Sequence, residues 1–359
     1  MPQAGDPEYV HAAEAAGLRY VTDALPGIRR RRHGRGFSYL DPDGRTVRER
    51  DVVRRIRSLV IPPGWTDVWI CPIPDGHLQV TARDARGRKQ YRYHPVFRER
   101  RDETKFARML ALSSVIQRIR ERVEHDIALP GLPRAKVMAT LVWLLERTLI
   151  RVGTAEYARE NDSFGLTTLR RRHVVSDGAA LRFEFRGKSG VSHAVSVADR
   201  RIVRIVQQCR ELRGYELFKY IDDDGAKQTV EAEDVNAYLR EIAGREITAK
   251  DFRTWAGTML AAEALREMGP ARTKKEAERN VVRAVDLTAS HLGNTRSVCR
   301  KYYIHPVLID AYLRGDVLPP QGAQQAKERR GAGGTLRRHE AETLAFLTAR
   351  IENPSVEPE

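Results

Sequence analysis

The sequence predicts an α+β protein with two domains: a small, mainly β domain over residues 1–100 and a larger, mainly α domain over residues 101–318. A chain of 359 residues is long enough for two domains. Up to about residue 100, short runs of alternating apolar residues lie between Gly-containing turns, which is typical of antiparallel strands. Beyond that point, apolar residues recur at i, i+3, i+4 and i+7, the spacing of helices that bury one face.

The N-terminal domain begins with a predicted helix over residues 6–18. A basic run, Arg29–Arg32, follows; it is either a set of phosphate contacts or a solvated loop. Residues 37–47 alternate around an Asp-Gly pair and predict a hairpin, and residues 51–59 predict a short helix. Residues 66–94 then contain several strands, which Asp-Gly and Arg-Gly turns separate.

The second domain begins with two predicted amphipathic helices, in residues 106–127 and 136–153. A β-hairpin island interrupts the helices at about 165–197, after which helices dominate to about residue 315. The acidic run Asp222–Gly225 inside this region predicts a hairpin turn rather than a metal site, because Asp and Gly are turn formers.

Residues 319–359 predict a linker followed by a C-terminal helix. The stretch after Pro319 and Pro320 is polar and rich in Gly and Gln, which is typical of a flexible linker. Residues 336–350 have the pattern of an amphipathic helix. This helix either docks back on the body of the protein or binds a partner, and the sequence leaves both roles open.

Charge is the most informative bulk property. The chain carries 63 Lys and Arg against 48 Asp and Glu, a net charge of +15 with a pI near 10.0. Such a balance attracts polyanions. Nucleic acid is the first candidate partner and an anionic membrane surface the second, while a basic enzyme from an Arg-rich proteome remains the plain alternative.

The compartment follows from the cysteines and the N-terminus. Cys71, Cys209 and Cys299 are few and far apart, so they suggest neither a disulfide framework nor a zinc ribbon. The first 20 residues lack the apolar core of a signal peptide, and no run approaches 18 apolar residues. We expect an intracellular, cytoplasmic protein that does not cross a membrane.

Several kinds of chemistry have no motif in this sequence. Gly187-Lys188-Ser189 ends like a phosphate-binding loop, but Arg182 stands where the first glycine of that motif would be. The sequence also contains no H-E-x-x-H zinc motif and no calcium loop. We therefore expect no small-molecule cofactor, no ATP and no catalytic metal.

Four segments of the second domain stand out together: IRVGTAEYARENDSFGLTTLRRRHV, FRGKSGVSHAV, ITAKDFRTWAGTMLAA and LGNTRSVCRKYYIHP. In type and order they resemble the catalytic segments of type IB DNA topoisomerases, in particular the compact bacterial and poxvirus subfamily. Arg151 and Lys188 are 37 positions apart, and Asn294 and Tyr303 are 9 apart, as in that family. With GRKQYRYH in the first domain, the resemblance covers about residues 18–315.

The resemblance implies the catalytic fold that type IB topoisomerases share with tyrosine recombinases, and it makes Tyr303 the nucleophile. The phenol would form a 3′-phosphotyrosyl link with one DNA strand, which conserves the bond energy and removes the need for ATP. Tyr302 is the obvious rival, although the spacing favours Tyr303. A phenol with a pKa of about 10 is neutral at pH 7, and the sequence does not identify the group that removes its proton.

The resemblance also assigns four supporting residues. Arg151 and Arg253 would bind the nonbridging oxygens of the scissile phosphate, because a guanidinium donates two parallel hydrogen bonds and stays charged. Lys188, in a predicted β-turn, would protonate the leaving 5′ oxygen; an ordinary solvated lysine is the alternative. Asn294 stands where poxvirus members have histidine. An amide donates a hydrogen bond but cannot transfer a proton, so Asn294 would only bind the transition state.

Further residues are expected at the DNA surface. In GRKQYRYH, Gln90, Tyr91 and Tyr93 match a family segment that enters the major groove. Tyr91 and Tyr93 would share one face of a strand, and packing in a sheet core is their alternative role. A larger set is expected to contact the DNA backbone: Arg83, Arg86, Arg88 and Lys89 beside that segment, and Tyr157 and Lys250 near the cut.

Taken together, the resemblance predicts a type I DNA topoisomerase that binds double-stranded DNA, clamps it between two basic domains and acts as a monomer on the nucleoid. Relaxation would proceed by single-strand cleavage, swivelling and religation, without ATP or metal. Two other functions remain open. A tyrosine recombinase uses a similar Arg, Lys, Arg and Tyr set, and a non-catalytic DNA-binding protein would explain the charge alone.

Overall fold

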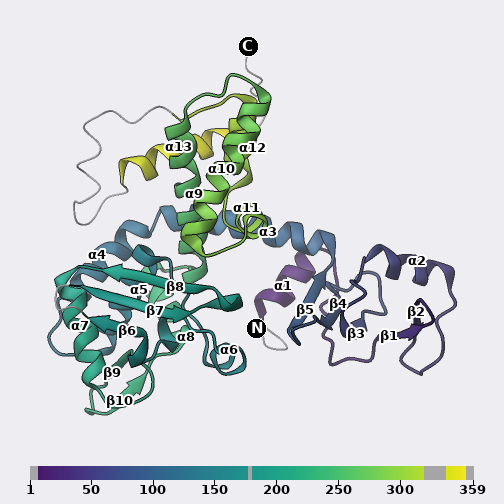
Figure 1. Ribbon diagram of the computed structural model, residues 1–359, viewed down its shortest axis with the longest axis horizontal. Coiled ribbons are helices and arrows are strands. Elements are labelled where there is room, and N and C mark those ends of the chain that lie inside the picture. The colour runs from purple at the N-terminus through teal and green to yellow at the C-terminus, as the bar shows by residue number, and fades with distance from the viewer. Residues whose placement is uncertain (1–6, 177–179, 319–336, 353–359) are drawn as a thin grey trace. The chain divides into compact units, whose positions relative to one another are not determined.

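The structure of the protein, a computed structural model, describes residues 7–176, 180–318 and 337–352 (Figure 1). The chain divides into two compact units, Met1–Lys105 and Phe106–Glu359. The division falls inside helix α3 (Pro95–Ser113), which begins in the first unit and ends in the second. An antiparallel sheet in the first unit and a mostly helical second unit confirm the α+β class.

The first unit is built on a five-stranded antiparallel sheet in the order β2-β1-β3-β4-β5. Apolar side chains cover both of its faces: Ile56 packs with Val80 in one cluster, and Trp69 packs with Leu78 in another. The elements of this unit are α1 (Pro7–Ala15), β1 (Ile28–His33), β2 (Gly36–Leu40), α2 (Arg50–Ser58), β3 (Thr66–Ile70), β4 (Leu78–Arg83) and β5 (Lys89–Tyr93).

The basic run Arg29–Arg32 is strand β1, so the prediction of a solvated loop is wrong. Its backbone pairs with β2, and the Arg30 guanidinium donates hydrogen bonds to the carbonyls of Pro62 (3.0 Å) and Trp65. The sequence of four arginines does not predict these backbone and side-chain hydrogen bonds. The hairpin expected over residues 37–47 is confirmed, since the Asp41 N–H donates to the Arg45 carbonyl across the turn (2.9 Å).

The second unit is mostly helical, with a three-stranded antiparallel sheet in the order β6-β7-β8. This sheet is the predicted β island. The elements of the unit are α4 (Ile116–Ile127), α5 (Arg134–Thr148), α6 (Ala155–Asn161), η1 (Leu166–Thr168), η2 (Arg171–His173), β6 (Val174–Ser176), β7 (Leu181–Arg186), η3 (Lys188–Gly190), β8 (Ser192–Val197), α7 (Arg200–Glu211), β9 (Lys219–Ile221), β10 (Lys227–Thr229), α8 (Ala232–Ala243), α9 (Ala249–Met268), α10 (Lys274–Leu292), α11 (Arg296–Tyr302), α12 (Pro306–Arg314) and α13 (Arg338–Glu352).

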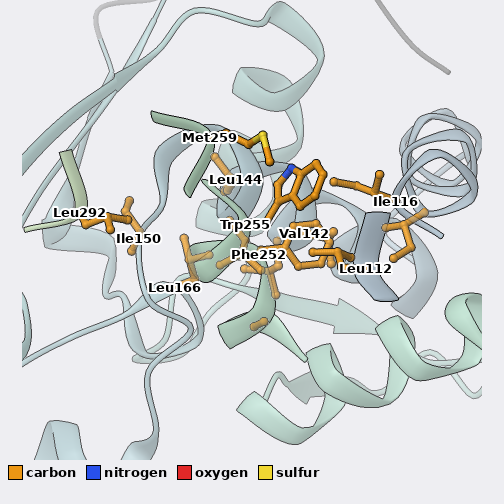
Figure 2. Packing of buried hydrophobic residues seen from close by; sticks show 14 of the residues in the cluster. Leu112, Ile116, Val142, Leu144, Ile150, Leu166, Phe252, Trp255, Met259 and Leu292 are labelled. Atoms are coloured by element: carbon orange, nitrogen blue, oxygen red, sulfur yellow. The ribbon is translucent and has the colours of Figure 1, made fainter. Parts of the chain in front are cut away.

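A single hydrophobic core fills the second unit, and helix α9 runs through it. Figure 2 shows Phe252, Trp255 and Met259 of α9 among side chains that come from α3, α4 and α5. A helix buried on all sides lacks the one-sided apolar pattern of a surface helix. Because α9 is fixed by this packing, a side chain that it carries to the surface of the core is held in one place.

In this unit the predicted acidic turn is confirmed, and the C-terminal helix, whose role the sequence left open, is placed. The acidic run Asp222–Gly225 is the turn between β9 and β10, closed by the Asp222 N–H and the Ala226 carbonyl (3.0 Å). The C-terminal helix α13 docks on the body: Leu347 is buried in the core, and Glu340 accepts two hydrogen bonds from Arg120, at 2.9 and 2.8 Å. The linker predicted ahead of it, over 319–336, lies outside the described residues.

Candidate functional site

Four of the predicted site residues lie within two positions of a fully buried apolar residue. These neighbours fix the backbone of the site to the core: Ile150 for Arg151, Phe252 for Arg253, Leu292 for Asn294 and Ile304 for Tyr303. Figure 2 shows Ile150, Phe252 and Leu292 in the same packed cluster. Segments more than 150 positions apart in the sequence therefore meet at one edge of the core.

Tyr303 follows the last residue of α11, and its ring lies beside the Arg253 guanidinium. The Arg253 guanidinium carbon lies 5.3 Å from the centre of the Tyr303 ring. The neighbouring Tyr302, by contrast, is 36% exposed, and its ring faces the Lys301 ammonium. The structure thus brings Tyr303, and not Tyr302, to the arginines of the site.

Helix α9 also holds the backbone of Tyr303. The Thr258 hydroxyl donates to the Tyr303 carbonyl (3.3 Å) and accepts from the His305 N–H (3.1 Å). One residue earlier, Gly257 lies so close that a Cβ built on it would be 2.5 Å from the Tyr303 carbonyl oxygen. Arg253 and Gly257 are one helical turn apart, so one face of α9 carries both a phosphate-binding candidate and the support for the phenol.

Arg253 is buried and only partly satisfied. Its two terminal nitrogens donate to the carbonyls of Leu149 and Leu292, the latter at 2.8 Å. Its Nε is buried and has no hydrogen-bond partner among the described residues. Burial, together with the like charge of Arg151, lowers the pKa of this guanidinium to about 10. An acceptor with negative charge would relieve both the unpaired donor and the unfavourable charge.

Arg151 and Asn294 form a direct pair. Arg151 donates a hydrogen bond to Oδ1 of Asn294 and thereby orients the carboxamide. The other end of that amide, Nδ2, is buried and has no acceptor among the described residues. The site therefore holds two buried donors without acceptors among the described residues, Arg253 Nε and Asn294 Nδ2.

The charges of the site act directly on the phenol. Burial alone would raise the pKa of Tyr303, but the guanidinium groups of Arg253 and Arg151, with a smaller effect from Lys250, outweigh it. The pKa therefore falls below its ordinary value of 10.0. These cations stabilise the phenolate, which is the form that a tyrosine nucleophile needs.

Lys188 lies in the exposed turn η3 between β7 and β8, as the sequence predicts. The Gly190 N–H closes the turn on the Gly187 carbonyl (3.0 Å), and Ser189 has a left-handed backbone (φ 64°). The Lys188 ammonium lies 5.7 Å from the centre of the Tyr157 ring, so these two predicted residues are brought together. Lys250 is exposed on the first turn of α9.

The remaining predicted DNA contacts lie in the first unit, on edge strand β5. The rings of Tyr91 and Tyr93 stack with their centres 6.2 Å apart, which confirms that they share a face. Tyr93 also packs against Phe97 (5.4 Å between ring centres), and burial raises the pKa of its phenol. Tyr93 thus has a packing role, whichever role it has toward DNA.

The polar neighbours of these tyrosines already have partners within the unit. Gln90 and Arg88 both donate to Asp84, and the hydrogen bond from the Arg88 side chain is the main reason why the pKa of that carboxyl falls to about 2. Lys89 forms an ion pair with Asp23 (2.6 Å). Both ion pairs are half-buried, so DNA would have to displace the carboxylates before it could contact these cations.

Sequence reasoning missed three residues at this site. Gly257 and Thr258 support Tyr303, and His193 of β8 lies against the glycines that precede Lys188 and Asn294. All three are within segments that the resemblance singled out. No sequence signal marks them, because each matters through a close approach to a residue distant in the chain.

Within residues 7–176, 180–318 and 337–352, no three His, Cys, Asp or Glu side chains lie together in a way that could hold a metal ion. No helix in these ranges is long and apolar enough to span a membrane.

Two family models match the chain. The catalytic core of eukaryotic DNA topoisomerase I matches residues 94–313, and the N-terminal domain of bacterial DNA topoisomerase IB matches residues 36–84.

Viral relatives extend this similarity. The DNA topoisomerase 1B of Acanthamoeba polyphaga mimivirus is 30% identical over 295 residues, which cover 80% of this chain and 88% of that protein. The DNA topoisomerase 1 of rabbit fibroma virus is 29% identical over 117 residues, or 32% of this chain and 36% of that protein. The DNA topoisomerase 1B of vaccinia virus (strain Copenhagen) is 26% identical over 110 residues, 31% of this chain and 35% of that protein.

The first model covers more than half of the chain, and the mimivirus relative aligns with most of both proteins. Both matches are consistent with an antiparallel sheet in the first unit and a mostly helical second unit. This chain belongs to the type IB DNA topoisomerase family.

Proposed function

We propose that this type IB topoisomerase relaxes supercoiled DNA through a 3′-phosphotyrosyl intermediate on Tyr303. The Tyr303 oxygen attacks the scissile phosphorus, the bond from phosphorus to the 5′ oxygen breaks, and the phenol proton passes to water. Rotation of the strand beyond the cut changes the linking number. The freed 5′ hydroxyl then attacks the phosphotyrosine, which restores the phosphodiester and the phenol. Bond energy is conserved throughout, so the cycle consumes no ATP.

The observation that carries this proposal is the pair of buried donors without acceptors among the described residues, Arg253 Nε and Asn294 Nδ2, together with a Tyr303 phenol whose pKa the neighbouring arginines lower. A phosphodiester supplies what both donors lack, since its nonbridging oxygens accept hydrogen bonds and carry negative charge. That charge grows in the transition state, so donors fixed in advance favour the reaction rather than binding alone. Arg151 contributes its own charge and orients the Asn294 amide.

Lys188 is assigned to the leaving group. An alkoxide is expelled slowly without a proton, and a placed general acid contributes about 10²–10⁴ in rate. The ammonium of Lys188 gives its proton to the 5′ oxygen during cleavage and regains one during religation. Its place in an exposed turn, 5.7 Å from the Tyr157 ring, leaves it accessible to DNA.

We also infer the manner of DNA binding. Tyr91 with Tyr93 contacts the major groove, Gln90, Arg88 and Lys89 exchange their carboxylate partners for DNA, and Tyr157 and Lys250 contact the backbone near the cut. The second unit has the catalytic fold shared with tyrosine recombinases. The protein acts as a monomer on the chromosome in the cytoplasm and requires neither metal nor a small-molecule cofactor.

Plasmid relaxation with EDTA and without ATP tests this proposal. The natural protein, Tyr302→Phe and Tyr303→Phe are compared, and covalent protein–DNA complexes are trapped with detergent. We expect relaxation and trapping by the first two proteins. Tyr303→Phe should bind DNA with unchanged affinity yet lose relaxation by at least about 10³-fold, because no other group forms the covalent link.

Tyr302→Phe is a matched control, since it removes the same hydroxyl from the adjacent, exposed residue. Relaxation that survives Tyr303→Phe would move the nucleophile elsewhere. A requirement for metal or ATP, or DNA binding without relaxation by the natural protein, would replace the topoisomerase with another DNA-binding function. Exchange of strands between specific sites would instead identify a recombinase.

A further inference from the structure

His193 occupies a position between two parts of the site. It lies on β8 opposite Phe185 of β7, and the two rings stack with their centres 5.0 Å apart and an angle of 12° between their planes. This stacking fixes the plane of the imidazole. Beyond the ring lie two glycines from separate elements, Gly187 and Gly293.

Both glycines contact the imidazole so closely that neither position has room for a side chain. A Cβ built on Gly187 would be 2.6 Å from Cδ2 and Nε2 of His193, and one on Gly293 would be 2.8 Å from Cε1. Real Cβ atoms do not approach a ring so closely, because such distances are well inside van der Waals contact. The imidazole is therefore wedged between two stretches of backbone.

Each stretch leads into a residue of the proposed mechanism. Gly187 immediately precedes Lys188 and opens its turn, and its own N–H donates to the Val191 carbonyl (2.7 Å). Gly293 ends α10 and immediately precedes Asn294, which is paired with Arg151. The His193 ring thus contacts both the turn that carries Lys188, the proposed general acid, and the cap that carries Asn294, the proposed phosphate ligand.

We propose that His193 is a positioning residue that holds the Lys188 turn at a fixed distance from the Gly293–Asn294 cap, so that leaving-group protonation and phosphate binding act on the same phosphate. This inference rests on the proposed role of Lys188. The cap belongs to a long, packed helix, whereas the turn is exposed. Removal of the ring therefore displaces mainly the turn. Burial and the charges of Arg151 and Arg253 lower the pKa of His193, which keeps the ring uncharged beside these cations.

The test measures single-turnover cleavage on a duplex whose cleavage site has first been mapped with the natural protein. Two versions of the duplex are used, one with the natural 5′ oxygen at the cut and one with sulfur in its place. A thiolate leaves without a proton, so the sulfur duplex bypasses the general acid. His193→Ala should slow cleavage of the oxygen duplex about 10- to 100-fold, because a shift of about 1 Å in a catalytic group can cost 10²-fold.

Three results are expected if His193 acts through Lys188. The sulfur duplex restores most of the rate of His193→Ala, as it does for Lys188→Ala. The double variant is no slower on the oxygen duplex than Lys188→Ala alone. His193→Phe, which keeps a planar ring against Phe185 and the two glycines but has no ring nitrogen, retains more activity than His193→Ala.

Other results overturn the inference. An equal loss for His193→Ala on both duplexes would mean that the ring does not act through Lys188. A loss for His193→Phe as large as that for His193→Ala, with both variants folded by circular dichroism, would assign the function to a ring nitrogen instead. Failure of sulfur to rescue Lys188→Ala would refute the general-acid assignment itself, and the two failures are therefore distinguishable.

His291→Ala is the matched control. His291 is exposed on the last turn of α10, two residues before Gly293, and its ring contacts the Leu287 carbonyl within its own helix (2.8 Å). It is thus a histidine of the same cap region without contact to the turn. We expect its cleavage rate to equal that of the natural protein on both duplexes.

Discussion

At the scale of single residues, Asn294 illustrates how one side chain can serve two purposes. Its Oδ1 accepts a hydrogen bond from Arg151, which leaves Nδ2 buried and without an acceptor among the described residues. An unpaired buried donor costs about 1–3 kcal/mol. In the proposed mechanism this donor binds the scissile phosphate. The cost is then preorganisation, because the donor needs no rearrangement when the anion binds.

Asn294→Ala should therefore reduce the rate of cleavage by about 10²–10³-fold, the usual effect of losing one oxyanion donor. DNA affinity should change by less than about 3-fold, because most of the affinity comes from other phosphates. Single-turnover cleavage and equilibrium binding at one salt concentration measure the two effects. Ser297→Ala, three positions further on and exposed, is the control. An equal loss in binding and cleavage would make Asn294 an ordinary DNA contact.

The sequence alone identifies the site residues but not their contacts. The type and spacing of Arg151, Lys188, Arg253, Asn294 and Tyr303 are visible in the sequence. The structure places Arg151 and Arg253 near the Tyr303 phenol and pairs Asn294 with Arg151. The sequence does not show which side chains these residues contact. Nothing in the sequence predicts that Lys89 pairs with Asp23, or that His193 fills the space that two glycines leave, since these contacts join residues far apart in the chain.

At the scale of elements, helix α9 connects the hydrophobic core to the candidate site around Tyr303. Phe252 and Trp255 anchor it in the core, Arg253 faces the phenol, and Gly257 with Thr258 holds the Tyr303 backbone. The one-turn spacing of Arg253 and Gly257 could be noticed in the sequence. The approach of Tyr303 to that face could not, because it depends on how α11 returns to α9.

Gly257→Ala tests this arrangement by setting two effects against each other. Alanine stabilises a helix by about 1 kcal/mol relative to glycine. Here its Cβ would lie 2.5 Å from the Tyr303 carbonyl oxygen, which is backbone and cannot rotate away. We expect the displacement to dominate: cleavage falls at least about 10-fold, and thermal unfolding shows no gain in Tm.

The control for this change is Ala256→Gly, the reverse substitution at the neighbouring position of the same helix. It removes about 1 kcal/mol of helix stability without adding an atom near Tyr303. A lower Tm with normal cleavage in Ala256→Gly would separate helix stability from nucleophile position. If Gly257→Ala instead gains stability and cleaves normally, α9 does not set the position of Tyr303.

Strand β1 shows where element-level reasoning fails. Four consecutive arginines do not alternate in polarity, so their strand was not predicted from periodicity. The structure makes the run a strand because β2 supplies backbone hydrogen bonds and because the Arg30 guanidinium finds carbonyl acceptors. The hairpin turns, in contrast, were predicted correctly, since Asp-Gly pairs act locally.

At the scale of the whole molecule, the net charge of +15 does not show which cations are available to bind DNA. Some cations are paired internally; Arg201, for example, contacts both Glu124 and Asp199. Arg31 and Arg32 of β1 are exposed, and neither has a carboxylate partner among the described residues. Attraction for DNA should come mainly from cations of the second kind, because a paired cation is already neutralised.

DNA binding measured across salt concentrations tests this distribution. The logarithm of affinity should fall linearly with the logarithm of salt concentration, by about 0.9 for each phosphate neutralised. Arg31→Ala and Arg32→Ala should each flatten that slope by about 1 if they contact phosphates. Arg201→Ala, which removes the same charge from an exposed but paired position, should leave the slope unchanged. If all three variants flatten it equally, net charge alone governs the encounter; if none does, β1 lies outside the DNA path and the phosphate contacts belong to other exposed cations.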